Sequence, residues 1–309
     1  MHSPVVLGLD FGGTKIAGAV CDMTGLRLGS ITIDTRASDG AQSSLERGLL
    51  AARSLLDSSA RGRPLAAVGA CTIGIPNENG ISLAPAIPGW GALVLDRELR
   101  RVFESAEIRL ATDVKAAAQA EAEWGALVGF DPGIYLNLGT GLAVAIVANG
   151  AVVTGSHGAA GEIGYNLRHM SDVGRPLDDR LPLEGAVSGM ALTRAALDVF
   201  STADSAATVF ERSAHNPRVA RLVTDFIAEL SYHLVNLAIA VDPARIVVGG
   251  GMVRSWDQLY GGLRKALDAA VPFPPDLVRA DFPFDAPLMG ALALGLAAAR
   301  EVRSEEVSA

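Results

Sequence analysis

A chain of 309 residues and 31.9 kDa is long enough to form two domains, each with its own core. Half of the residues are apolar and 19% are charged, which excludes a disordered protein. Lys and Arg number 26 against 34 Asp and Glu, and the net charge of −8 gives no general reason to bind nucleic acid.

The sequence predicts neither a targeting segment nor a membrane span. The first residues contain no basic region and reach Asp10 too early for a signal peptide. Residues 133–161 are uncharged, but polar and glycine-rich turns interrupt them before the roughly 20 apolar residues that a span needs. Cys21 and Cys71 are too few for a disulfide framework and lack zinc-ligand spacing. We therefore expect a reducing, cytoplasmic location.

The opening residues, 5–20, predict a strand, a glycine turn and a second strand. A helix over 43–58 and a buried strand over 66–75 follow, and then a looser segment rich in Pro and Gly. The next helix begins at Thr112-Asp113, where either residue is a suitable N-cap, and ends near Gly125.

Residues 134–147 repeat the opening unit. Asp10 aligns with Asn137, and Gly12-Gly13 aligns with Gly139-Thr140. A unit that occurs twice, about one domain length apart, predicts a duplicated α/β architecture with a cleft between its halves.

The last third of the chain predicts a long amphipathic helix over 218–241 and a strand over 245–248 that leads into Gly249-Gly250-Gly251. A helix is expected from Ser255 onward. A small, apolar helix over 288–300 suits packing against a sheet, and the polar residues 301–309 are expected to fray.

The first glycine turn has the composition of a phosphate-binding loop. Gly12 and Gly13 let backbone N–H groups approach phosphate oxygens, Thr14 adds a hydroxyl and Lys15 a positive charge. Asp10, at the end of the strand, could hold Mg²⁺ through water. The alternative is an ordinary tight hairpin, in which the same residue types are common.

Two further glycine segments support nucleotide binding. Gly139-Thr140-Gly141 repeats the first turn in the second half, and the two turns together could clamp a polyphosphate. Gly249, Gly250 and Gly251 would allow the backbone to pass close to an adenosine or an α-phosphate, although a plain strand-to-helix turn has the same composition. The chain contains neither a Walker loop nor a Gly-x-Gly-x-x-Gly motif after its first strand.

The order of the motifs resembles the ROK family of sugar kinases and sugar-responsive repressors, from Val6 to about Ala297. The motifs that carry the resemblance are Asp10-Phe11-Gly12-Gly13-Thr14-Lys15, Leu138-Gly139-Thr140-Gly141, Ala160-Gly161-Glu162-Ile163-Gly164, Leu183-Glu184-Gly185-Ala186-Val187-Ser188-Gly189 and Val247-Val248-Gly249-Gly250-Gly251. The resemblance implies the duplicated actin-like ATPase (ribonuclease H-like) fold with two domains and an interdomain cleft. We expect a smaller domain at 1–112, completed by a helix at about 288–303, and a larger one at 113–287.

The resemblance also implies the catalytic residues. Asp113 takes the position of the general base that accepts the proton of a sugar's primary hydroxyl during in-line attack on the γ-phosphoryl group. The alternative is that Asp113 only caps its helix. Glu162 and Glu184 are expected to accept hydrogen bonds from ring hydroxyls, against the alternative of two solvated turn residues.

Three positions depart from the family pattern near the sugar. Thr112 stands where Asn is usual, Ala86 replaces the Asn before Ile87-Pro88-Gly89-Trp90, and Tyr165 replaces a histidine. Thr112 and Tyr165 are expected to contact a substrate that need not be glucose; an amino sugar or a cyclitol is also possible.

The zinc motif of many family members is missing. The segment 168–182 contains no cysteine, so no zinc is expected. We expect packing to order this segment, or ion pairs that join Arg175 or Arg180 to Asp178 or Asp179.

The resemblance thus implies a kinase that uses ATP and Mg²⁺ to phosphorylate the 6-hydroxyl of a hexose-like sugar and that acts as a homodimer, and we expect neither nucleic-acid nor membrane partners. A catalytically weak sugar sensor is the alternative; the family's repressors carry a DNA-binding segment before the first motif, and only nine residues precede Asp10. An actin-like assembly ATPase would not need Glu162 and Glu184.

Overall fold

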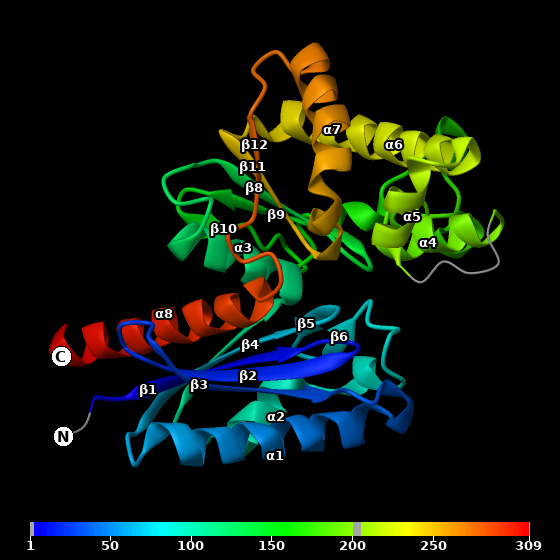
Figure 1. The fold of residues 1–309 in the computed structure, drawn as a ribbon. Helices are drawn as coiled ribbons and strands as arrows, with labels where there is room; N and C mark the ends of the chain where they lie inside the picture. Colours follow the sequence, from blue (N-terminus) through cyan, green and yellow to red (C-terminus); the bar gives the residue numbers. More distant parts are fainter. Residues whose placement is uncertain (1–2, 200–204, 309) are drawn as a thin grey trace. The chain divides into compact units, whose positions relative to one another are not determined.

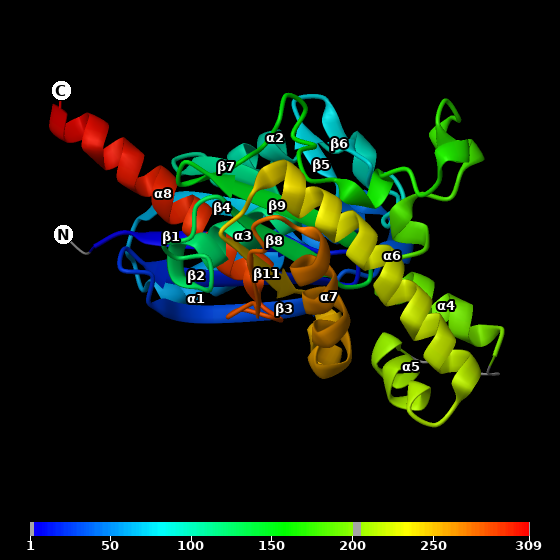
Figure 2. The ribbon, with the colours of Figure 1, turned by 90° about the horizontal axis from the view of Figure 1, so that it is seen from above.

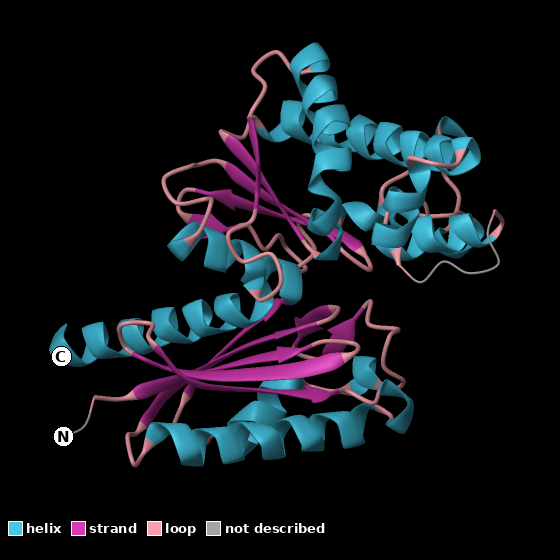
Figure 3. Ribbon diagram, viewed as in Figure 1, coloured by secondary structure: helices cyan, strands magenta, loops and turns pink. Residues whose placement is uncertain are grey.

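The computed structural model describes residues 3–199 and 205–308, which form two compact units. Unit 1 consists of Met1–Glu123, Thr154–Ala159 and Asp285–Ala309, and unit 2 consists of Trp124–Val153 and Ala160–Phe284. Each unit is an α/β assembly with its own sheet and its own hydrophobic core (Figures 1 and 3).

The sheet of unit 1 has the strand order β3-β2-β1-β4-β7. These strands are β1 (Val5–Phe11), β2 (Lys15–Asp22), β3 (Arg27–Asp34), β4 (Leu65–Thr72) and β7 (Glu107–Thr112). Strand β2 pairs antiparallel with both β1 and β3, whereas β1, β4 and β7 run parallel. The carboxyl ends of β1, β4 and β7 therefore meet at one edge of the sheet. Every residue of β1 is buried, because helices cover both faces of this strand.

Helices α1 (Ala41–Ala60) and α2 (Leu95–Val102) pack on one face of this sheet, and α3 (Asp113–Trp124) and α8 (Ala286–Ser308) pack on the other. A short hairpin, β5 (Ile75–Asn77) and β6 (Gly80–Ser82), follows β4. The short 3₁₀ helices η1 (Ala37–Asp39) and η2 (Trp90–Ala92) complete the unit.

Helix α8 corrects two expectations. It continues to Ser308, where we expected residues 301–309 to fray (Figure 2). Ion pairs hold its polar end: Arg109 meets Glu301 at 2.7 Å, and Arg300 meets Glu123 at 3.1 Å. Helix α8 also keeps α3 in unit 1, beyond the predicted division after Thr112.

The reason for that division is close packing between the two helices. A Cβ placed on Gly290 of α8 would lie 1.7 Å from the carbonyl oxygen of Ala116 in α3. Only glycine lets the two backbones approach this closely.

The sheet of unit 2 has the order β10-β9-β8-β11-β12, which reproduces the topology of unit 1 and confirms the predicted duplication. Its strands are β8 (Gly133–Leu138), β9 (Leu142–Ala148), β10 (Ala151–Val152), β11 (Arg245–Gly249) and β12 (Asp276–Arg279). Asp10 and Asn137 each occupy the next-to-last position of the first strand of their hairpin. The glycine turns therefore occupy equivalent places in the two units.

The helices of unit 2 enclose one core with the sheet. They are α4 (Gly189–Leu197), α5 (Ala206–Ser213), α6 (Pro217–Val241) and α7 (Trp256–Ala270), together with the 3₁₀ helices η3 (Ile163–Tyr165), η4 (Met170–Asp172), η5 (Leu177–Asp179), η6 (Leu183–Gly185) and η7 (Gly251–Ser255). The Asn216 side chain caps α6 by accepting from the N–H groups of Arg218 and Val219.

Within the described residues, α6 alone is long and apolar enough to meet the composition of a membrane span. Its apolar face, with Phe226, Leu230 and Leu234, is buried in the core of unit 2. The hydropathy of α6 is therefore explained by its packing inside the unit.

Candidate functional site

The first glycine turn connects β1 to β2 and is held by two hydrogen bonds from Thr35. Thr35 donates its hydroxyl to the carbonyl of Gly12 at 2.7 Å and its N–H to the carbonyl of Thr14 at 2.9 Å. A Cβ on Gly12 would lie 2.8 Å from the carbonyl oxygen of Lys15, so the turn requires glycine there. The side chains of Thr14 and Lys15 are exposed at this turn, where they can reach a phosphate.

Asp113 lies at the same edge of the unit 1 sheet. It follows β7 directly, and the parallel register aligns Phe11 of β1 with Thr72 of β4 and Thr72 with Thr112 of β7. Two carboxylates, Asp10 and Asp113, are thereby placed near each other beside the glycine turn. Their proximity appears in the pKa of Asp10, because the charge of Asp113 is the second largest influence that raises it.

The start of α3 is capped locally. The Thr112 hydroxyl accepts from the N–H of Lys115 at 3.2 Å, and Asp113 Oδ1 accepts from the N–H of Val114 at 2.8 Å. Thr112 is buried, while Asp113 remains half-buried at the edge of the sheet. Capping by Thr112 therefore leaves the Asp113 carboxylate at the surface of the unit, where it could act on a substrate.

No sequence pattern indicated which residue contacts Asp10. Cys71 aligns with Asp10 across the parallel pair β1 and β4, and its Sγ lies 3.5 Å from Asp10 Oδ1. Burial raises the pKa of the Cys71 thiol well above its usual value, so the thiol stays protonated and can donate to the carboxylate. Burial, followed by the charge of Asp113, raises the pKa of Asp10 to about 7.

The Asp10 carboxylate, with Asp113 nearby, fits an Mg²⁺ ion held through water. Oxygen is the preferred donor for this ion, and a divalent cation offsets the repulsion between Asp10 and Asp113 that the raised pKa of Asp10 reveals. In the described part of the chain, no group of three or more His, Cys, Asp or Glu side chains could hold a metal ion. A bound Mg²⁺ would therefore take its remaining ligands from water and from nucleotide phosphates, as this ion commonly does.

The pKa of Asp10 makes a prediction for stability in the absence of metal. The stability that the protonated Asp10 contributes is full below its unfolded pKa of 3.8 and is lost as the pH rises through about 7. With EDTA present, Asp10→Asn should therefore raise the Tm at pH 8, and by much less at pH 5. Asp22→Asn is the control, because hydrogen bonds from Thr24 lower the pKa of Asp22. It should lower the Tm at pH 8. Equal effects of Asp10→Asn at both pH values would contradict the prediction.

The second glycine turn, in unit 2, is covered by the start of α4. The N–H of Gly189 donates to the carbonyl of Gly139 at 2.8 Å, and the N–H of Met190 donates to that of Thr140 at 3.3 Å. A Cβ on Gly189 would lie 2.6 Å from the Gly139 oxygen, so this contact needs glycine on α4. Sequence reasoning found the turn but not the helix that packs on it.

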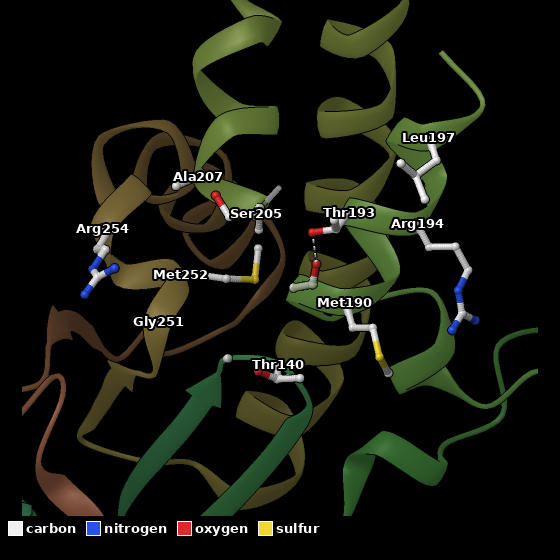
Figure 4. A pocket seen from close by; sticks show the side chains of 13 residues that line it. Thr140, Met190, Thr193, Arg194, Leu197, Ser205, Ala207, Gly251, Met252 and Arg254 are labelled. Atoms are coloured by element: carbon white, nitrogen blue, oxygen red, sulfur yellow. Dashed lines mark hydrogen bonds between the residues drawn. The ribbon is translucent and has the colours of Figure 1, made fainter. Parts of the chain in front are cut away.

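A cavity of about 520 Å³ opens beside this turn, within the size range of small-molecule sites (Figure 4). Helix α4 contributes one wall, and residues 251–254 and the start of α5 contribute the others. The lining residues are Gly139, Thr140, Gly189, Met190, Thr193, Arg194, Leu197, Ser205, Ala206, Ala207, Gly251, Met252 and Arg254.

The cavity brings together three of the predicted nucleotide residues, Gly139, Thr140 and Gly251. Gly249 and Gly250 do not line it. A Cβ on Gly249 would lie 2.1 Å from the Tyr135 hydroxyl oxygen, and Gly250 has φ +84° and packs against the end of β8. These two glycines therefore serve the packing of β11 against β8.

The predicted sugar residues gather elsewhere in unit 2. Glu184 lies in η6, and its Oε2 accepts from the N–H of Leu142 at 2.8 Å, directly after the turn at Gly141. Glu162 precedes η3, which ends at Tyr165 and packs against η6. Burial raises the pKa of the Tyr165 hydroxyl, and the charges of Glu184 and Glu162 raise it further. A phenol and two carboxylates thus form one polar group.

Gly161 fixes the position of that group against the sheet. Its φ is +87°, and a Cβ there would lie 2.0 Å from the carbonyl oxygen of Val144 in β9. The N–H of Val144 donates to the Gly161 carbonyl at 2.9 Å. Glycine is required at this point of the motif, because any side chain would push Glu162 away from β9.

The segment that follows Tyr165 is ordered by other ion pairs than the predicted ones. Arg175 lies 3.7 Å from Asp172 and donates to the backbone carbonyl of Asp179, while Arg180 donates to the carbonyls of Tyr165 and Asn166. The strongest tie joins Arg168 to Glu229 of α6. The prediction that Arg175 or Arg180 pairs with the side chains of Asp178 or Asp179 was wrong, because backbone carbonyls and α6 provide the partners instead.

Comparison with known proteins places nearly the whole chain in the family that its motifs resemble. The ROK family model matches residues 6–298. A glucokinase of Thermotoga maritima is 27% identical over 86% of this chain and 88% of its own length. A kanosamine kinase of Amycolatopsis mediterranei is 30% identical over 98% of this chain and 100% of its own length. The crystal structure of a ROK hexokinase from Thermus thermophilus is 30% identical, with a TM-score of 0.79 and coverage of 97% and 99%.

Proposed function

The chain belongs to the ROK family and is a sugar kinase with the actin-like ATPase fold, and on this premise we propose its reaction. It transfers the γ-phosphoryl group of ATP to the primary 6-hydroxyl of a hexose or hexose-like sugar. The observation that carries this proposal is the placement of Asp113 and Asp10 beside the glycine turn, at one edge of the unit 1 sheet.

In this reaction Asp113 is the general base. Its carboxylate accepts the proton of the sugar hydroxyl and orients the oxygen for attack on the phosphorus, with ADP as the leaving group. The hydrogen bond from Val114 occupies Oδ1. It fixes the carboxylate group, so the base needs no reorganisation at the moment of transfer.

In unit 1, Thr14 and Lys15 are the proposed contacts to phosphate oxygens. In unit 2, the proposed nucleotide residues are Gly139, Thr140 and Gly251, which line the cavity beside α4. Mg²⁺, when bound near Asp10, neutralises charge on the transferring phosphoryl group.

The sugar is assigned to Glu162, Glu184 and Tyr165. The two carboxylates accept hydrogen bonds from ring hydroxyls, and the Tyr165 hydroxyl can both donate and accept. Glucose and kanosamine, the sugars in the names of two relatives, are the first candidates. That the protein forms a homodimer, that it lies in the cytoplasm and that it binds no zinc remain predictions. The two cysteines, Cys21 and Cys71, are both buried and free.

The experiment that tests this proposal measures ADP release against a panel of glucose, 2- and 3-amino sugars and cyclitols. We expect at least one panel member to stimulate ADP release at a kcat of about 1–100 s⁻¹, the usual range for kinases. The phosphorylated carbon is then identified by NMR, and carbon 6 is expected. If no compound is turned over but one binds, the sugar-sensor alternative replaces the kinase.

A further inference from the structure

The segment between Tyr165 and η6 is tied to α6 by a charged pair. The guanidinium of Arg168 donates from Nε to Oε1 and from Nη2 to Oε2 of Glu229, the latter at 2.9 Å. Both side chains are largely buried, with 17% of Arg168 and 25% of Glu229 exposed. A bidentate pair of this kind fixes orientation as well as distance, which a single contact cannot do.

A second tie lies beside the first on the same helix. Asn166 Nδ2 lies 3.4 Å from Nδ1 of His233, which follows Glu229 by one helical turn. Burial lowers the pKa of His233. Both contacts use residues of α6 that lie next to its core-facing residues Phe226, Leu230 and Leu234, so the anchor is rigid.

The tied segment leads directly into the residues assigned to the sugar. Arg168 follows Tyr165 by three positions, and Arg180 returns to donate to the Tyr165 carbonyl at 2.9 Å. The N–H of Tyr165 donates to the carbonyl of Glu162 at 3.1 Å. The backbone that carries Tyr165 and Glu162 is thus continuous with the segment that Arg168 anchors.

We propose that the Arg168–Glu229 pair positions the sugar-binding residues of unit 2. It holds the chain that leaves Tyr165 against α6, so that Tyr165 and Glu162 keep the orientation in which they contact the sugar. The inference rests on the proposed function. Arg168 and Glu229 act only through these neighbours and are positioning residues, not catalytic ones.

The test compares Glu229→Gln with a matched control in the same unit. Glu229→Gln removes the charge and keeps the shape of the side chain. Asp276→Asn does the same to the Arg245–Asp276 pair, which joins β11 to β12 at 3.0 Å, away from the sugar residues. Steady-state kinetics use D-glucose and 3-amino-3-deoxy-D-glucose as sugars, and hydrogen exchange of residues 165–182 is followed without sugar.

We expect Glu229→Gln to raise the KM for the sugar about tenfold, because a displacement near 1 Å of a binding group can cost up to about 10²-fold. The KM for ATP should stay within twofold, and exchange in residues 165–182 should accelerate. Asp276→Asn should change none of these quantities. Faster exchange with an unchanged KM for the sugar would show a merely structural pair and would overturn the proposal.

A reversed pair separates positioning from general damage. Arg168→Glu combined with Glu229→Arg restores the two opposite charges. The KM of this double variant for the sugar should return to within about threefold of the parent value. Either single variant should raise the KM at least as much as Glu229→Gln. Failure of the reversed pair to recover, with both proteins folded, would contradict the pairing. A parent that phosphorylates no sugar overturns the proposed function itself, whereas an active parent with an equally active Glu229→Gln variant overturns this inference alone.

Discussion

Replacing Asp113 by Asn should lower kcat by about 10²–10⁴, which is the usual contribution of a positioned general base. Asparagine keeps the size of the side chain, and its amide oxygen can still accept from the N–H of Val114. It cannot accept a proton at neutral pH. Helix α3 should stay intact, because its cap is the Thr112 hydroxyl.

The measurement is the rate of ADP release with the sugar that the panel identifies, together with the affinity for ATP from calorimetry. The affinity for ATP should change by less than about twofold, since a base acts on the transition state and not on nucleotide binding. Asp22→Asn is the control, because Asp22 is also half-buried in unit 1 and accepts from backbone N–H groups, but it is the last residue of β2. Turnover by Asp113→Asn within about twofold of the parent would refute the base.

Replacing Gly69 by Ala should destabilise unit 1 by about 1–3 kcal/mol or more, because overpacking typically costs about 1–3 kcal/mol and occasionally more. Gly69 lies in β4 under α8. A Cβ there would lie 1.9 Å from the carbonyl oxygen of Ala291 and 2.6 Å from the nitrogen of Gly295. Both atoms belong to the backbone of α8, so relief requires the helix to move away from the sheet.

Urea denaturation followed by circular dichroism measures this effect. The urea midpoint should fall. ADP release should fall with it, because α8 supports the sheet edge that carries Asp10 and Asp113. The contact that shows this support is the Pro287 carbonyl of α8, which lies 3.4 Å from the Sγ of Cys71. Gly261→Ala is the control, since no atom lies within 4 Å of a Cβ at this position of α7. It should leave the midpoint unchanged or raise it slightly. Similar losses in both variants would refute the packing argument.

Local pattern was sufficient for the hairpins and the glycine turns. Glycine, aspartate and threonine between two apolar runs predict a turn without reference to the rest of the chain, and Asp10 and Asn137 occupy equivalent positions as expected. The long helix over 218–241 corresponds to α6, and the strand over 245–248 corresponds to β11, because periodicity and chain length encode such elements directly. Short elements such as β3, α2 and β12 were missed, because a stretch of four to eight residues is too short for its pattern to identify an element.

Sequence patterns predicted the duplicated fold and the two glycine turns that we propose to bind phosphate, and the family resemblance pointed to Asp113 as the candidate base. Only long-range packing set the surroundings of these residues. It placed Cys71 beside Asp10, set Gly189 on the second turn, joined Arg168 to Glu229 and packed α8 against β4 from the far end of the chain. Each of these contacts joins residues that are dozens to hundreds of positions apart. No local pattern encodes such partners, because strand register and helix packing, which depend on the complete core, bring them together.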